Sequence, residues 1–219
     1  MQTESLRRPE NRSSFTLIEL LVVITILAIL AALLLPSLGR GKAMARKTAC
    51  LNRTRQIGIA LNLYTEDNSQ WYPVDNIYTP PQWTWTLKSY WGDTDDTPHP
   101  LKFLEDPGMP SETALTLWWH SHYTANMDLV SRWNGSGNPR LSYKKDRVTV
   151  PDQTMIITCG TTLRIFKAWH LTNSPERIYS PHPSYTHNVL FVDQHVESWS
   201  RNDLPLDKND VFWKPDYQL

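Results

Sequence analysis

Three aspartates within a short acidic segment are the first candidates for metal chemistry. Asp93, Asp95 and Asp96 belong to the run GDTDD. Carboxylate oxygens are the ligands that Ca²⁺ prefers, so this segment is a candidate calcium site. It has no bidentate Glu and no Gly at the fixed position of a closed ligand loop. A solvated acidic turn is therefore the simpler interpretation, and we expect no cofactor.

A pair of histidines offers a second kind of metal ligand. His120 and His122 are two residues apart, so they would share one face of a strand and could begin a zinc site. No Cys, Asp or third His follows at a spacing typical of zinc sites, and a polar pair on an aromatic surface is the simpler interpretation. The chain also lacks a Gly-x-Ser-x-Gly elbow and a phosphate-binding loop. A metal-dependent hydrolase is thus the weakest functional hypothesis.

The tryptophans suggest a different function, the binding of a polysaccharide. Trp83 and Trp85 would place two indole rings on one strand face, and Trp118 and Trp119 are further candidates for exposed rings. Sugars stack on such faces. Core packing of a domain that is short of aliphatic residues explains the same tryptophans more simply.

One apolar run must anchor all of these residues. The segment from Phe15 to Leu35, FTLIELLVVITILAILAALLL, contains Glu19 as its one ionisable group and has no Gly or Pro. As a helix it is about 31 Å long, close to the hydrocarbon thickness of a bilayer. We therefore expect it to span a membrane. A carboxylate at this depth either reaches the headgroups or meets a positive group on a neighbouring copy of the helix.

The residues around this run resemble a known family. Ser14-Phe15-Thr16-Leu17-Ile18-Glu19, with a short basic leader before it and Pro36 after the apolar run, is similar to the signal of type IV prepilins and type II secretion pseudopilins. The resemblance implies cleavage between Ser14 and Phe15 by prepilin peptidase, and methylation of Phe15. It implies that Glu19 pairs with the terminal amine of a neighbouring subunit and that Pro36 kinks the helix. The family prefers Gly before the cut, where this chain has Ser14.

The topology follows from the resemblance rather than from charge alone. Six basic residues follow the apolar run within about twenty positions, and the positive-inside rule alone would keep the C-terminal part in the cytosol. The resemblance implies the opposite: a single-pass protein of the inner membrane, with a cytoplasmic N-terminus before processing and a periplasmic or extracellular head.

The chain from residue 37 to 68 continues the helix into water. Cys50, Ile57, Leu61 and Tyr64 recur at helical spacing and predict an apolar stripe that faces a domain, within a total helix of about 50 residues. The segment Cys50 to Gly58, CLNRTRQIG, resembles the CxNNLRQIG stretch of pseudopilin-like proteins with large C-terminal domains.

The remaining residues, 69–219, predict a loop-rich head domain with a small aromatic core. All ten tryptophans and most prolines lie there. A short helix is expected near 83–91. Strands are expected where β-branched or aromatic residues cluster between turn formers, at 154–158, 163–167, 188–192 and 195–199. Asp193-Gln194 would join the last two strands as a tight hairpin.

The C-terminal hairpin carries a third resemblance. His182, followed by the run Asn188 to Val196, NVLFVDQHV, is similar to the HxxxxxxxxxDG motif of the same pseudopilin-like proteins. His182 and Asp193 would be the motif residues, with His187 as a competing candidate. Gln194 stands where the family has the turn Gly. We interpret the motif mainly as a hairpin with an Asp-initiated turn.

The two cysteines would both lie in the exported part that the resemblance implies. A Cys50–Cys159 disulfide would then tie the long helix to the head in an oxidising compartment, and two small buried thiols are the alternative. The family often pairs its helix cysteine with a later Cys-Pro, but residues 103–110 contain no Cys. Some major pseudopilins of the family hold calcium in the head.

The predicted fold is α+β and pilin-like: a leader at 1–14, a membrane and assembly half-helix at 15–36, an amphipathic half-helix at 37–68, and a head with an antiparallel sheet at 69–219. The expected function is that of a structural subunit of a type II secretion or type IV pilus-like machine, not an enzyme. Its partners would be other pilin subunits, prepilin peptidase and the inner membrane. The chain has 22 basic and 22 acidic residues, so nucleic acid is not an expected partner.

Overall fold

The computed structural model describes residues 16–74, 82–97, 99, 101–109, 121–130, 132–133, 139–140, 143–160, 165–166, 182–207 and 210–213. In chain order the α-helices are α1 (Leu17–Asp67), α2 (Trp83–Thr86) and α3 (Met127–Val130). The strands are β1 (Tyr123–Asn126), β2 (Arg132–Trp133), β3 (Pro139–Arg140), β4 (Met155–Cys159), β5 (Ile165–Phe166), β6 (Thr186–Phe191) and β7 (Val196–Ser200). Short 3₁₀ helices are η1 (Lys88–Trp91), η2 (Lys102–Leu104), η4 (Lys145–Arg147), η6 (Pro183–Tyr185) and η7 (Arg201–Asp203).

The helix α1 is 51 residues long, which confirms the prediction of a helix of about 50 residues. It ends where the backbone turns left-handed at Ser69 and Gln70, whose φ values are 53° and 68°. The Asn68 backbone N–H donates to Tyr64 O, and the Gln70 N–H donates to Thr65 O. These bonds satisfy carbonyls that the end of a helix otherwise leaves free.

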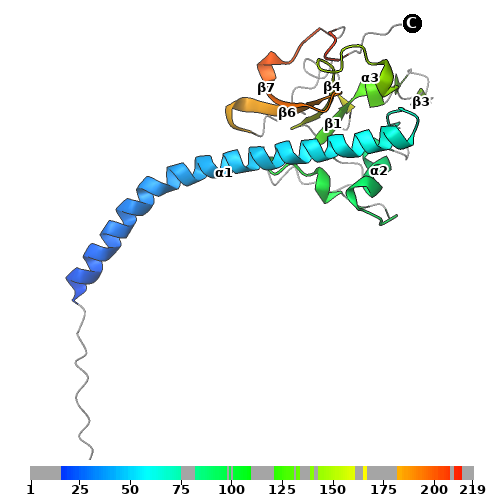
Figure 1. Cartoon of the computed structure of the whole chain (residues 1–219). Helices are drawn as coiled ribbons and strands as arrows, with labels where there is room; N and C mark the ends of the chain where they lie inside the picture. The colour runs from blue at the N-terminus through cyan, green and yellow to red at the C-terminus, as the bar shows by residue number, and fades with distance from the viewer. Residues whose placement is uncertain are drawn as a thin grey trace, which may run out of the picture. The chain divides into compact units, whose positions relative to one another are not determined.

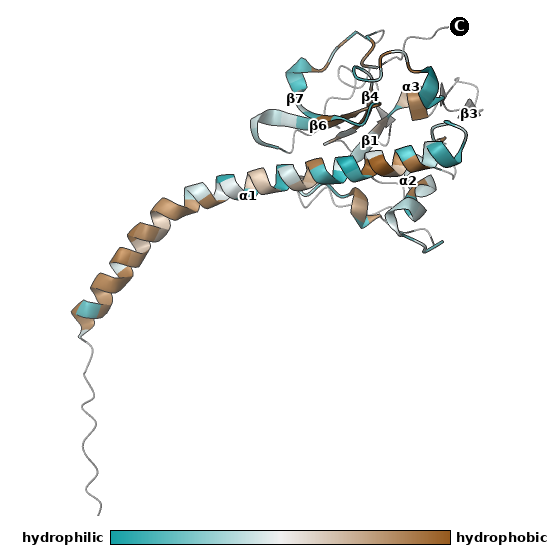
Figure 2. Ribbon diagram, viewed as in Figure 1, coloured by the Kyte–Doolittle hydropathy of each residue, from teal (hydrophilic) through white to brown (hydrophobic). Residues whose placement is uncertain are grey.

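The chain divides into two compact units, Met1–Lys42 and Ala43–Leu219. In the first, the described residues form the N-terminal part of α1, and its large aliphatic side chains are exposed. Figure 2 shows this part as strongly hydrophobic. By length and composition α1 can cross a membrane: its most apolar 18-residue window has a mean hydropathy of 3.0 and no buried residue.

The second unit is built on a five-stranded sheet with the order β5-β1-β4-β6-β7 (Figure 1). The strands β1, β4, β6 and β7 pair antiparallel with their neighbours, whereas β5 pairs parallel with β1. Among the described residues, β2 and β3 form a separate two-stranded ladder. This arrangement confirms the predicted α+β fold with a long N-terminal helix and an antiparallel sheet.

One core cluster joins the C-terminal part of α1 to the sheet. Cys50, Ile57 and Leu61 are fully buried, and Tyr64 packs at the margin of the same cluster, so the predicted apolar stripe is confirmed. The partners of the stripe come from other elements; they include Trp83, Leu87, Tyr123, Ala125, Ile157 and Leu190. Burying an Ile or Leu side chain stabilises a fold by about 1.5–3 kcal/mol. The stripe therefore fixes α1 on the sheet.

The opposite side of the sheet has its own smaller core. Val189 and Phe191 alternate with Leu190 along β6, so they point away from the α1 side. They pack with Phe212 and Trp213 from the C-terminal region. The sheet is thus covered on both faces, with α1 on one and aromatic residues from the end of the chain on the other.

The predicted strands lie within two residues of β4, β5, β6 and β7, and the short helix near 83–91 appears as α2 followed by η1. The predicted hairpin between the last two strands is confirmed, but its connection is longer than expected. Four residues, from Val192 to His195, separate β6 from β7. Gln194 has a φ of 80°, in the left-handed region that favours Gly.

At Gly58, α1 lies close to the hairpin of β6 and β7. A Cβ atom at this position would lie 2.7 Å from Gln194 Oε1 and 3.0 Å from Leu190 Cδ2. Such contacts are too short without movement of the neighbours, and Leu190 belongs to a filled core.

We expect Gly58→Leu to lower the free energy of unfolding of the Ala43–Leu219 unit by about 1–3 kcal/mol, because it overpacks this contact. Urea unfolding followed by tryptophan fluorescence measures the change, since all ten tryptophans lie beyond residue 70. Gly39→Leu is the control, because nothing lies within 4 Å of the Cβ position at Gly39. Equal stability of the two variants would contradict the close packing at Gly58.

We expect Gln194→Gly to raise the free energy of unfolding by up to about 1 kcal/mol, because glycine adopts a positive φ without strain. Gln194→Val should lower it by a similar amount or more. Gln153 is exposed and has no positive φ, so Gln153→Gly should be neutral or slightly destabilising. The same unfolding assay ranks the three variants, and a loss of stability in Gln194→Gly would show that φ at this turn is not strained.

Candidate functional site

The first candidate site is the start of α1, where Glu19 caps its own helix. The Thr16 backbone N–H and hydroxyl each donate to Glu19 Oε2 at 2.8 Å. In return the Glu19 N–H donates to Thr16 Oγ1 at 3.2 Å. This reciprocal pair is a capping box, which satisfies two of the free N–H groups at a helix start. The carboxylate therefore has a partner within its own chain.

The remaining residues predicted for this site have different outcomes. Ser14 and Phe15, the predicted cleavage and methylation positions, lie outside the described residues. Pro36 lies inside α1, where it cannot donate the usual intrahelical hydrogen bond. The kink predicted there stays a prediction.

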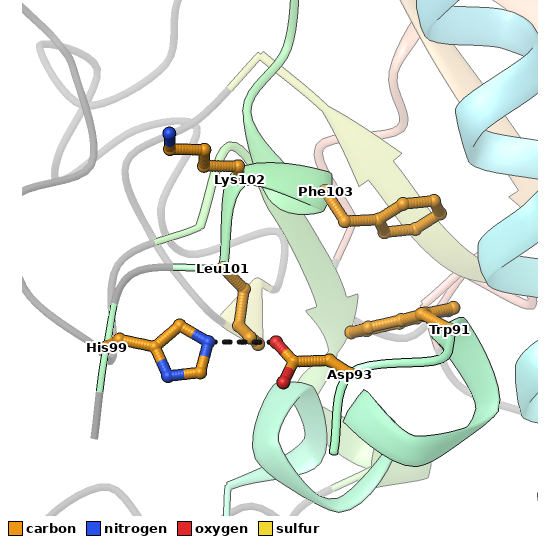
Figure 3. Close-up of a pocket in the computed structure, with 6 residues that line it drawn as sticks. All are labelled: Trp91, Asp93, His99, Leu101, Lys102 and Phe103. Atoms are coloured by element: carbon orange, nitrogen blue, oxygen red, sulfur yellow. Dashed lines mark hydrogen bonds and ion pairs between the residues drawn. The ribbon is translucent and has the colours of Figure 1, made fainter. Parts of the chain in front are cut away.

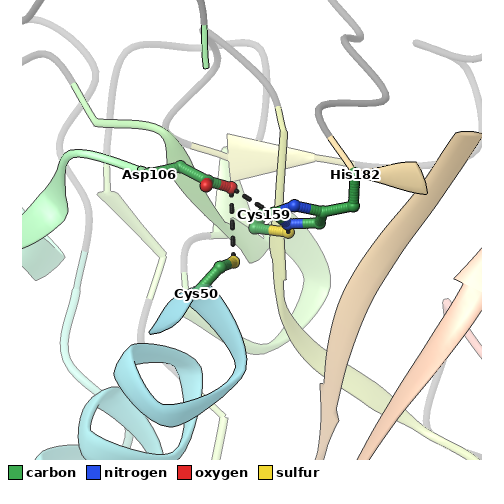
Figure 4. A group of neighbouring side chains, drawn as sticks. All are labelled: Cys50, Asp106, Cys159 and His182. Carbon is green, nitrogen blue, oxygen red and sulfur yellow. Dashed lines mark hydrogen bonds and ion pairs between the residues drawn. The ribbon is translucent and has the colours of Figure 1, made fainter. Parts of the chain in front are cut away.

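The second candidate site is a buried cluster of Cys50, Asp106, Cys159 and His182 (Figure 4). Cys50 comes from α1, Asp106 follows η2, and Cys159 is the last residue of β4. His182 forms a backbone bridge with Thr186 just before β6. Each of these residues is at least 96% buried. The fold thus gathers four reactive side chains from distant parts of the sequence.

The reactive atoms of this Cys-Asp-Cys-His cluster lie within hydrogen-bonding distance of one another. The Cys50 Sγ–H donates to Asp106 Oδ2 over 3.3 Å. His182 Nε2 is 3.4 Å from the same oxygen and 3.4 Å from Cys159 Sγ. One ligand atom from each of the four residues can be chosen so that all lie within 4.8 Å of one another.

Backbone and side-chain groups around the cluster hold its members in place. Asn188 donates its backbone N–H to Cys159 Sγ at 3.2 Å, and Gly108 donates its N–H to Asp106 Oδ1 at 2.8 Å. The Asp106 N–H donates to His122 Nδ1 at 3.0 Å. His122, one of the two predicted zinc ligands, therefore supports the cluster from outside, and His120 lies outside the described residues.

The pKa of each residue in the cluster depends on its neighbours in the cluster. Burial acts to lower the pKa of His182, but hydrogen bonds with Asp106 and Cys50 outweigh burial and raise this pKa to about 9. Burial acts to raise the pKa of Cys50, but hydrogen bonds with Cys159 and His182 lower it to about 7. Burial, together with its contact to Cys50, raises the pKa of Cys159 well above its usual value. The Asp106 carboxylate beside the ring thus favours the protonated form of His182.

The predicted disulfide between Cys50 and Cys159 stays a prediction. The structure brings Cys50 and Cys159 together, as a disulfide between α1 and the head would require, but both are free buried thiols. The alternative interpretation, two small buried thiols, agrees with this state. In the region 103–110, where the related proteins often have a Cys-Pro, this chain has Asp106-Pro107, and Asp106 contacts Cys50.

The two residues of the C-terminal motif lie in different environments. His182 belongs to the buried cluster, whereas Asp193 lies in the turn between β6 and β7. Asp193 Oδ1 accepts from the His195 backbone N–H at 3.1 Å and contacts His195 Nδ1 at 2.5 Å. Its role as the initiating residue of the turn agrees with the prediction. His187, the competing candidate, is buried and contacts Cys159 O through Nδ1 at 2.9 Å.

The acidic segment proposed as a calcium site does not converge on one point. Asp93 Oδ2 contacts His99 Nε2 at 2.8 Å, and Asp95 Oδ1 accepts from Thr97. Asp96 Oδ1 forms an ion pair with Lys88 Nζ at 2.9 Å. Asp93 and Asp95 share His99 as a partner, since Asp95 Oδ2 lies 3.7 Å from His99 Nδ1, and these contacts agree with an ordered acidic turn. Calcium binding here stays a prediction without support from these contacts.

A surface pocket of about 290 Å³ adjoins this acidic segment (Figure 3). Its wall contains Trp91, whose ring stacks on Phe103 with 5.0 Å between centroids. The Asp93–His99 contact closes part of the same wall. The pocket is at the lower end of the volumes typical of small-molecule sites, and one face of its indole ring is already covered.

The predicted sugar-stacking face of two tryptophans is wrong. Trp83 is fully buried, and both rings belong to the helical turn α2 rather than to a strand. Lys88 Nζ lies 4.5 Å from the centroid of the Trp85 ring, and the His99 ring packs edge-on against the same ring. Trp118 and Trp119 lie outside the described residues. Core packing, the simpler interpretation, accounts for Trp83.

Sequence reasoning missed two residues of these sites. Thr16 was detectable, because a Thr three positions before a Glu at a helix start is the pattern of a capping box. Asp106 had no local signal, since only the fold brings it to a cysteine 56 positions earlier in the chain.

Comparison with known proteins bears on the N-terminal site. Residues 11–35 match the family model described as the prokaryotic N-terminal methylation motif. A stretch of 71 residues, 32% of this chain, is 35% identical to the type II secretion system core protein G of Escherichia coli (strain K12). The chain spans about half the length of this relative, 48%. No solved structure matches the chain.

The methylation motif covers Glu19 and the exposed apolar run of α1, which are the features that distinguish this end of the chain. In its N-terminal part, the chain is therefore similar to proteins that carry the prokaryotic N-terminal methylation motif and to the type II secretion protein named above.

Proposed function

We propose that this protein is a structural subunit of a type II secretion or type IV pilus-like machine. Prepilin peptidase cleaves it between Ser14 and Phe15, and Phe15 is then methylated. The mature chain joins other pilin-like subunits through the N-terminal half of α1 and presents its head outside the cytoplasm. Its role is mechanical rather than catalytic.

The observation that carries the proposal is the bare apolar surface at the start of α1. Leu17, Leu27 and Leu33 are 83%, 59% and 72% exposed, and the most apolar window of the helix has no buried residue. Exposure of a continuous apolar surface of this size to water is unfavourable, so a bilayer or the same helix of other subunits must cover it. The methylation motif at residues 11–35 supports contact with the helices of other subunits in addition to contact with a bilayer.

Glu19 supplies the specificity of assembly in this proposal. A carboxylate within an apolar surface costs a few kcal/mol unless it meets a partner. The capping box with Thr16 satisfies some of its hydrogen-bonding capacity, and the described residues include no counter-ion for its charge. The amine freed by cleavage before Phe15 of a neighbouring subunit supplies that positive charge.

The test separates the charge of Glu19 from its capping role. Gln also caps a helix at this position, so Glu19→Gln keeps the capping box and removes the charge. Thr16→Ala removes the cap, which is worth about 1 kcal/mol, and keeps the charge. We expect Glu19→Gln to reduce crosslinked multimers in the native host at least tenfold, which corresponds to about 1.4 kcal/mol. Thr16→Ala should stay within about threefold of the unaltered chain.

Glu66→Gln is the matched control, because Glu66 is an exposed glutamate near the other end of α1. Mass spectrometry of the mature N-terminus accompanies the crosslinking, and methylated Phe15 is the expected result. An intact Met1 in cells with working peptidase would contradict processing. Multimers of Glu19→Gln at the normal yield would contradict the charge pairing even if processing is confirmed.

A further inference from the structure

The cluster of Cys50, Asp106, Cys159 and His182 has the ligand types of a structural zinc site. Two thiolates, an imidazole and a carboxylate are all common zinc ligands, and a structural site has four of them with no open position. Among the described residues, this is the group of His, Cys, Asp and Glu side chains whose ligand atoms converge. All four residues are buried, so solvent does not compete for a coordination position.

The spacing of the reactive atoms agrees with a tetrahedral centre. Zinc bonds of about 2.0–2.3 Å at tetrahedral angles place neighbouring ligand atoms about 3.3–3.8 Å apart. Three pairs in the cluster are at 3.3, 3.4 and 3.4 Å, and the ligand atoms all lie within 4.8 Å of one another. Small side-chain rotations would bring the more distant pairs of ligand atoms, which lie within 4.8 Å, to the spacing of a tetrahedral zinc site.

The chemistry of the ligands selects among metals. Calcium and magnesium take oxygen ligands, so the two sulfur atoms disfavour them. A set of two sulfurs, one nitrogen and one oxygen in a tetrahedral arrangement is typical of zinc. Backbone N–H donors around the cluster could also orient the metal ligands. The Asn188 N–H to Cys159 Sγ and the Gly108 N–H to Asp106 Oδ1 hold two ligands from outside and remain in place when the inner atoms turn to a metal.

The position of the cluster indicates what a metal would do there. Cys50 lies on the face of α1 that packs on the sheet, whereas Cys159 ends β4 and His182 precedes β6. A bond from each to one ion crosslinks the helix to two neighbouring strands. This is the same connection that the predicted disulfide would make, with Asp106 and His182 as additional ligands.

We propose that Cys50, Asp106, Cys159 and His182 bind one Zn²⁺ that fastens α1 to the sheet of the Ala43–Leu219 unit. Both thiols release their protons to solvent on binding, and His182 binds through Nε2 as the neutral imidazole. The inference is independent of the proposed assembly function, because no residue of the N-terminal helical surface takes part in it.

The test begins with the full chain, purified in detergent under reducing conditions. One Zn²⁺ per chain is expected by elemental analysis. Replacement by Co²⁺ should give the visible bands of a tetrahedral centre and a near-ultraviolet thiolate-to-cobalt band. A chelator should lower the Tm reversibly, and zinc at a thousandfold excess over its Kd should restore about 10 °C. This measurement needs no substitution, so it does not depend on whether variants fold.

Substitutions then assign the ligands. Asp106→Asn and His182→Gln each remove one ligand with little change of shape, and each should weaken zinc affinity at least tenfold. Cys159→Ser should also abolish the thiolate contribution of that residue to the cobalt spectrum. The matched control is Asp93→Asn with His99→Gln, a half-buried Asp–His pair at 2.8 Å near the surface, whose loss should leave zinc content unchanged.

Three results would overturn the proposal. The first is less than a tenth of an equivalent of zinc or cobalt in chains whose thiols are free. The second is equal loss of metal in the surface control and in Asp106→Asn, which indicates an adventitious ion. The third is an intact mass two hydrogens lower in protein taken from cells without exposure to air, because a Cys50–Cys159 disulfide removes both thiolate ligands.

Discussion

The structure depends on one requirement: a single helix must bury its apolar side chains against two different environments. The N-terminal part of α1 exposes its large aliphatic side chains within its own unit, as far as the structure describes the chain, whereas the C-terminal part is apolar on one stripe that the sheet covers. An α-helix suits both because its backbone hydrogen bonds are internal, so the surroundings need only match its side chains. The composition of the surface therefore changes along α1 without a break in the backbone.

Polar groups are concentrated where α1 meets the sheet. A carboxylate, an imidazole and two thiols lie together beside the core cluster of aliphatic and aromatic residues. Buried charges are tolerated only when they are paired, because the interior solvates them poorly. Asp106 is paired with His182, and backbone N–H groups donate to Asp106 and Cys159. A network of this kind specifies one arrangement of helix and strands, since any other arrangement leaves a charge without a partner.

Local patterns predicted most of the elements and few of the contacts. The length of α1 and its stripe were predictable because helical periodicity is a property of neighbouring residues, and β4, β6 and β7 because their β-branched and aromatic runs are continuous. The strand β1 was not predicted, because its sequence, YTAN, has no such run. The sugar-stacking alternative for Trp83 was wrong, since alternation with Trp85 indicates a strand only if the backbone is extended, whereas the favoured interpretation of core packing was right. The contact between Cys50 and Asp106 depends on the tertiary fold alone.

The order of the strands has a consequence for biogenesis. The residues that cover the stripe of α1 include Ile157 from β4 and Leu190 from β6, which are synthesised more than 90 residues after Ile57. During synthesis the stripe therefore stays incompletely covered until these two strands have emerged, although Trp83 and Leu87 are available to it earlier. A chain that ends before β4 and β6 therefore lacks the residues that complete the cover of the stripe.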